Sequence, residues 1–76
     1  MQYTVFKKQT VNGEMTKTAT VKDTLLEAKQ NYHSALNLAY GTEGLEHVLC
    51  MIINDIGGVE LKEYYQKPEP ESKATE

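Results

Sequence analysis

Residues 48–53 read VLCMII, with an apolar side chain at every position, and the turn-forming residues DIGG follow at 55–58. The side chains of a β-strand alternate between its two faces, so an unbroken apolar run indicates a sheet that is covered on both faces. One set of side chains comprises Leu49, Met51 and Ile53, and the other comprises Val48, Cys50 and Ile52. The pattern of the whole chain predicts a single helix, which covers only one face. We therefore expect a second copy of the chain to cover the other face.

Residues 3–21 predict a β-hairpin that turns at Asn12-Gly13. Asn-Gly is a strong hairpin signal, because a type I′ turn needs a positive φ at both of its central residues. A two-residue loop places Phe6 opposite Ala19 and Thr4 opposite Val21. We expect the core face of this hairpin to carry Phe6, Met15, Ala19 and Val21, with Tyr3 and Val5 on the other face.

A helix is expected over residues 25–40. Thr24 and Glu27 have the spacing of a capping box, in which each side chain bonds the backbone N–H of the other residue. Gly41 suits the position that follows the end of a helix. Apolar residues recur at spacings of three and four, as one helical face requires; they are Leu25, Ala28, Tyr32, Ala35, Leu36 and Ala39.

Residues 45–54 and 59–65 predict a second hairpin, whose register the sequence leaves open. A four-residue loop places Ile52 beside Leu61, whereas a three-residue loop places Met51 there. A slip of one residue exchanges the two faces of a strand, so the register decides which apolar set meets the helix.

Together these elements predict an α+β fold for residues 1–66, in which the order ββαββ forms a four-stranded antiparallel sheet with the helix packed on one face. A right-handed connection from the second strand to the third, passing over the first, gives the strand order 2-1-3-4. Residues 67–76 contain two prolines and no large apolar side chain. We expect them to form a disordered acidic tail.

The composition favours self-association. A chain of 76 residues makes one domain at most, and a domain this small is marginally stable without reinforcement. A single cysteine allows no internal disulfide, and the cysteine and histidine spacing of a zinc site is lacking. Oligomerisation is the remaining source of reinforcement.

The charge distribution and the localisation signals limit the classes of partner that we expect. The net charge of −3 divides into +3 over residues 1–22 and −6 over residues 23–76, and all eight cations are lysine. The lack of arginine argues against specific nucleic-acid recognition. No secretory signal follows Met1, and no apolar run approaches the roughly 20 residues of a membrane helix. The lone Cys50 fits a reducing compartment, so we expect a cytoplasmic protein with no membrane partner.

No residue pattern predicts catalysis. Cys50 lies in the most apolar stretch, where burial makes a thiol unreactive. His33 falls on the polar side of the expected helix and His47 near the start of the third strand, with no sign of the orienting group that a catalytic pair needs. Because phosphate-binding and metal-binding motifs are also lacking, we expect neither an enzyme nor a cofactor or metal site.

The leading hypothesis is therefore a small non-catalytic protein-interaction module that forms a homodimer through the uncovered sheet face. Because the register is open, the candidate interface includes both apolar sets and the last two tyrosines: Val48, Leu49, Cys50, Met51, Ile52, Ile53, Tyr64 and Tyr65. The alternative is a protein that binds a small anionic ligand, a nucleotide or metabolite, in a tyrosine-lined pocket between subunits. Lys7 or Lys17 would then neutralise the ligand.

The layout of the chain resembles that of uncharacterised small proteins of Gram-positive bacteria and their phages. The segments that carry the resemblance are the Asn12-Gly13 hairpin, YHSA at 32–35, CMII at 50–53 and GGV at 57–59. It extends over the whole chain, contains no catalytic motif and transfers no site residue. It implies a phage-type accessory protein that binds a host or virion component.

Overall fold

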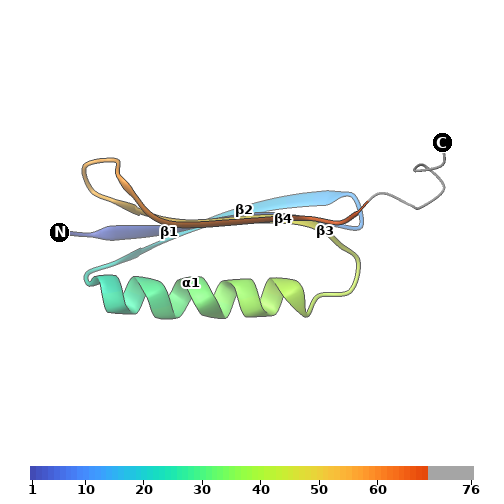
Figure 1. The fold of residues 1–76 in the computed structure, drawn as a ribbon, viewed down its shortest axis with the longest axis horizontal. Coiled ribbons are helices and arrows are strands. Elements are labelled where there is room, and N and C mark those ends of the chain that lie inside the picture. Colours follow the sequence, from blue (N-terminus) through green and yellow to red (C-terminus); the bar gives the residue numbers. More distant parts are fainter. Residues whose placement is uncertain (69–76) are drawn as a thin grey trace.

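The computed structural model describes residues 1–68, in which four strands and one helix form a two-layer α+β domain. The elements are β1 (Tyr3–Val11), β2 (Glu14–Lys22), α1 (Leu25–Tyr40), β3 (Leu45–Asn54) and β4 (Val59–Gln66). The strands form one antiparallel sheet of order β2-β1-β3-β4, and α1 lies along one face of it (Figure 1). The predicted fold class and strand order are confirmed. From residue 69 onward, the tail expected at 67–76 lies outside the described residues.

The first hairpin turns where the sequence predicts. Asn12 and Gly13 have φ angles of 52° and 83°, the positive values that a type I′ turn requires. Phe6 pairs with Ala19, and Thr4 pairs with Val21, as expected. The Asn12 N–H also donates a hydrogen bond of 3.1 Å to the carbonyl of Gly44, which links this turn to the loop between α1 and β3.

The second hairpin adopts the register of the longer loop. Ile52 pairs with Leu61, and a bulge follows between Ile52 and Ile53. The turn is held by the side chain of Asn54, whose Oδ1 accepts hydrogen bonds from the N–H groups of Ile56 (3.1 Å) and Gly58 (2.8 Å). This register sets Leu61 on the same side as Ile52, and the even-numbered apolar set of β3 lies beneath α1.

The helix begins and ends at the residues that the sequence indicates. Thr24 caps it by accepting a hydrogen bond of 3.1 Å from the backbone N–H of Glu27. The buried stripe of α1 consists of Ala28, Tyr32, Leu36 and Ala39. They pack with Val5, Val48, Cys50 and Ile52 of the sheet, which makes this layer the hydrophobic core. None of the helices described within residues 1–68 has the length and apolar character needed to cross a membrane.

The predicted core face of the first hairpin is wrong. Val5 is 3% exposed beneath the helix, and Tyr3 packs at the edge of the same core. The opposite face carries the residues expected in the core: Phe6, Met15, Ala19 and Val21. The pairing of β1 with β3 explains the difference, because it sets Val5 beside Ile52 and so on the helix side.

Candidate functional site

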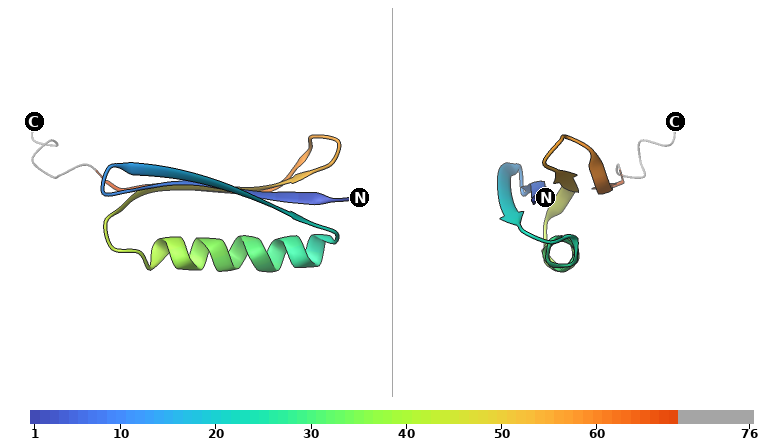
Figure 2. Two further views of the ribbon diagram at one scale, coloured as in Figure 1. Left: turned by 180° about the vertical axis from the view of Figure 1, so that it is seen from behind. Right: turned by 90° about the vertical axis from the view of Figure 1, so that its left-hand side faces the viewer.

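The sheet face opposite α1, here called the open face, has no element packed against it within the described chain (Figure 2). Cross-strand partners project to the same side of a sheet, so the strand pairing defines the residues of this face. They are Thr4, Phe6, Lys8 and Thr10 of β1; Met15, Lys17, Ala19 and Val21 of β2; His47, Leu49, Met51 and Ile53 of β3; and Val59, Lys62, Tyr64 and Gln66 of β4.

The centre of the open face is apolar. Phe6 and Met51 are partners on the two middle strands, and Leu49 and Ile53 flank Met51 along β3. These four side chains are partly exposed, although the sheet surrounds them with neighbours. Towards the edges of the sheet, Met15, Val21 and Tyr64 are each 55% exposed. A contiguous apolar surface of this kind is typical of an interaction site.

Lysines supply all the formal charge at the positions that the pairing assigns to the open face. Lys8 lies opposite Lys17 on β2 and opposite Leu49 on β3, while Lys62 lies opposite Met51. No Asp or Glu occupies a paired position on this face within residues 1–68; Glu60 of β4 lies at the bulge between the paired residues Val59 and Leu61 and has no paired position. The open face is therefore apolar and positively charged, whereas the chain as a whole is acidic.

The structure divides the eight candidate interface residues between the two faces. The open face receives Leu49, Met51, Ile53 and Tyr64; the helix side receives Val48, Cys50, Ile52 and Tyr65. Val48, Cys50 and Ile52 are 0% exposed because the helix covers them, so they belong to the core. Phe6 and Val21 join the interface candidates in their place.

The lysines of the alternative hypothesis are divided in the same way. Lys17 lies on the open face, but Lys7 pairs with Cys50 and so points to the helix side. Lys8 and Lys62, which the sequence did not single out, lie on the open face with Lys17.

On the same face, the ring of Tyr64 lies beside the His47 imidazole, with centroids 6.4 Å apart and planes tilted by 34°.

The candidate nucleophile and general bases are separated. Cys50 lies beneath α1 and His47 on the opposite face of the sheet, while His33 is exposed on the helix with its ring 5.1 Å from that of Tyr32. Burial raises the pKa of both the Cys50 thiol and the Tyr32 hydroxyl, which keeps each group neutral. Among the described residues, no three His, Cys, Asp or Glu side chains gather as a metal site would require.

Comparison of the chain with protein-family models, with curated proteins and with solved structures found no match.

Proposed function

We propose that this protein is a small non-catalytic interaction module that forms a homodimer by packing its open face against that of a second copy. The observation that supports the proposal is the apolar centre around Phe6 and Met51, which is left uncovered by the described chain. Sheet-on-sheet packing about 10 Å apart is a common way to bury two such faces.

The size of the open face is adequate for a dimer. Strands of about nine residues in a four-stranded sheet span roughly 30 Å by 20 Å, or about 600 Å² in projection per copy. Two copies would bury about 1,200 Å², the lower end of the range for stable interfaces. A domain of this length also gains stability from such burial.

The positions of the lysines determine how strongly the two copies repel each other in the dimer. Lys17 and Lys62 lie on the edge strands, from which long side chains can extend to the rim of an interface. Lys8 lies on a middle strand, from which its side chain does not reach the rim of the interface. We therefore expect Lys8 to oppose the dimer, and added salt to strengthen association by screening the repulsion between the copies.

A second candidate function is binding of a small anionic ligand on the same face. Lys8, Lys17 and Lys62, gathered on a face without a paired carboxylate, favour this alternative. The two candidates make opposite predictions for Lys8→Met. The substitution strengthens a homodimer but weakens binding of an anion.

Sedimentation velocity of the wild type, Lys8→Met and Met51→Lys tests the proposal. We expect a wild-type dimer at micromolar concentration, a tighter dimer for Lys8→Met and a monomer for Met51→Lys. Leu38→Lys is the matched control, because Leu38 is 69% exposed on the outer side of α1. A wild-type chain that remains monomeric at every concentration would refute the dimer. In that case, a rise in melting temperature with added ATP that Lys8→Met abolishes would identify the anion-binding alternative.

We propose in addition that the protein has a cytoplasmic, phage-type accessory role. Its support is the single buried Cys50, which suits a reducing compartment, and the resemblance in layout to small proteins of Gram-positive bacteria and their phages. Recovery of the tagged protein from the native host, in complex with a virion or host component, would test that role.

A further inference from the structure

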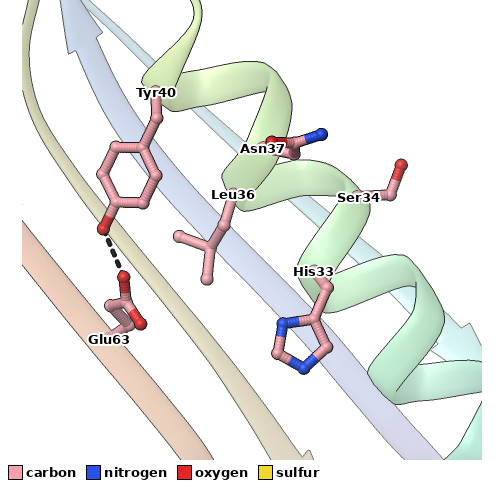
Figure 3. A pocket seen from close by; sticks show the side chains of 6 residues that line it. All are labelled: His33, Ser34, Leu36, Asn37, Tyr40 and Glu63. Carbon is pink, nitrogen blue, oxygen red and sulfur yellow. Dashed lines mark hydrogen bonds between the residues drawn. The ribbon is translucent and has the colours of Figure 1, made fainter.

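A groove runs between α1 and β4 on the helix side of the sheet, away from the open face. No Cα atom of α1 lies within 8 Å of a Cα atom of β4, so the helix backbone lies over the other three strands, and β4 is reached by side chains such as that of Tyr40. Two hollows of about 600 and 390 Å³ lie along this boundary, and both include Tyr40 in their walls. The larger is lined by His33, Ser34, Leu36, Asn37, Tyr40 and Glu63 (Figure 3).

The strand beside this groove is an edge strand. β4 pairs only with β3, so the backbone groups on its outer side have no strand partner in the described domain. An extended peptide can pair with such an edge and direct alternate side chains into pockets next to it. A groove between an edge strand and a helix provides both parts of that arrangement.

The groove selects for charge through Glu63. Tyr40 points across the groove and donates a hydrogen bond to Oε2 of Glu63 (Figure 3). This bond is the main reason why the pKa of Tyr40 rises to about 12, so the tyrosine remains a neutral donor. Glu63 is exposed, and the larger hollow has no lysine or arginine in its lining. A guanidinium group is the complementary partner for such a carboxylate.

The smaller hollow adds a partly apolar position. Its walls include Leu45 and Tyr65 beside the polar side chains of Thr42 and Lys67, and the ring of Tyr65 packs edge-on against that of Tyr40 with centroids 5.7 Å apart. Glu63 and Tyr65 are two residues apart on β4 and share its helix side. A peptide paired with β4 also presents every second side chain to this side, so residues two apart in the peptide reach the two hollows.

We propose that the groove binds an extended segment of a partner protein, which adds to the sheet as a fifth strand along β4. An arginine of the segment contacts Glu63, and an apolar residue two positions away fills the hollow at Tyr65. This site is distinct from the proposed homodimer interface, because the two lie on opposite faces of the sheet.

The test uses a fluorescein-labelled peptide, TVTRTVT, which is symmetric about its arginine and so fits either strand direction. We expect saturable binding by fluorescence anisotropy, with amide chemical-shift changes along β4 and the last turns of α1. The peptide TVTETVT, with glutamate in place of arginine, is expected not to bind.

Glu63→Gln removes the charge but retains an acceptor for Tyr40, so the fold is expected to persist. It should weaken binding about threefold to fivefold, the effect of a partly exposed ion pair. Glu14→Gln makes the same charge change at the opposite edge, on β2, and should leave the affinity unchanged. Equal binding of the two peptides, equal effects of the two variants, shifts confined to the open face, or no saturable binding would each overturn the proposal.

Discussion

Ile52 and Ile53 form a matched pair of probes for the two faces of the sheet. They are consecutive on β3 and have the same side chain, but Ile52 is 0% exposed beneath the helix, whereas Ile53 is partly exposed on the open face. Ile52 also lies between Val5 and Leu61 in the sheet. Substituting each by alanine removes the same atoms, from the buried core at Ile52 and from the partly exposed open face at Ile53.

The expected losses in the free energy of unfolding differ several-fold between the two positions. Ile52→Ala removes fully buried carbon atoms and leaves a cavity, at a cost of about 3 kcal/mol in the free energy of unfolding. A domain of this size has a total stability of roughly 3–10 kcal/mol, so this variant is close to unfolding. The milder Ile52→Val is expected to lose about 1 kcal/mol. Ile53→Ala is expected to lose about 1 kcal/mol or less in the monomer, because its side chain is already partly in contact with water.

Urea denaturation at protein concentrations about fiftyfold apart measures both effects, because the midpoint of a folded dimer depends on concentration. Substitutions at Ile52 should lower the midpoint at either concentration. Ile53→Ala should instead reduce the dependence of the midpoint on concentration. Equal losses for Ile52→Ala and Ile53→Ala, with no concentration dependence in the wild type, would show that the reasoning about the two faces is wrong.

Three further predictions concern the rest of the domain. Gly44→Ala should destabilise the fold by about 2 kcal/mol or more in urea denaturation, because Gly44 has a φ of +86° and an added Cβ would collide with the Asn12 side chain. Gly57→Ala, at a φ of +90° with open space around it, should cost less than Gly44→Ala. The Cys50 thiol should react with a thiol reagent only when the protein opens, so native protein that labels as fast as unfolded protein contradicts the burial. The pKa of Tyr40 is raised, so its hydrogen bond stabilises the fold below pH 10 and is lost as the pH rises through about 12; the ultraviolet titration of Tyr40→Phe should lack that late ionisation.

The elements that the sequence predicted correctly depend on local signals. The cap at Thr24 and the apolar stripe that follows it define α1 without reference to the rest of the chain. The Asn12-Gly13 turn likewise fixes the pairing of β1 with β2 through its own backbone geometry. Strand order then follows from the handedness of a single connection.

The faces of the strands could not be predicted in this way. Both parities of β1 carry apolar residues, and the choice between Val5 and Phe6 depends on how β1 pairs with β3, more than 40 residues away. Both parities of β3 are likewise apolar, and the packing of α1 on one side of the sheet decides which set is buried. The groove was not foreseen, because Tyr40 and Glu63 lie 23 residues apart in the chain and are brought together only by the packing of α1 on the sheet. A missing arginine and an Asn-Gly pair are visible in a sequence, but the offset of a helix across a sheet is not.

The open face and the groove lead to a joint prediction about the two proposed partners. A dimer formed through the open face leaves the β4 edge free, so the dimer and the TVTRTVT peptide should bind independently. Sedimentation in the presence of saturating peptide should therefore give an undiminished dimer, and Met51→Lys should bind the peptide as tightly as the wild type. A dimer that joined two copies along their β4 edges would instead occupy the groove. Dissociation of the dimer by the peptide would thus place the self-association at β4 and remove the open face from it.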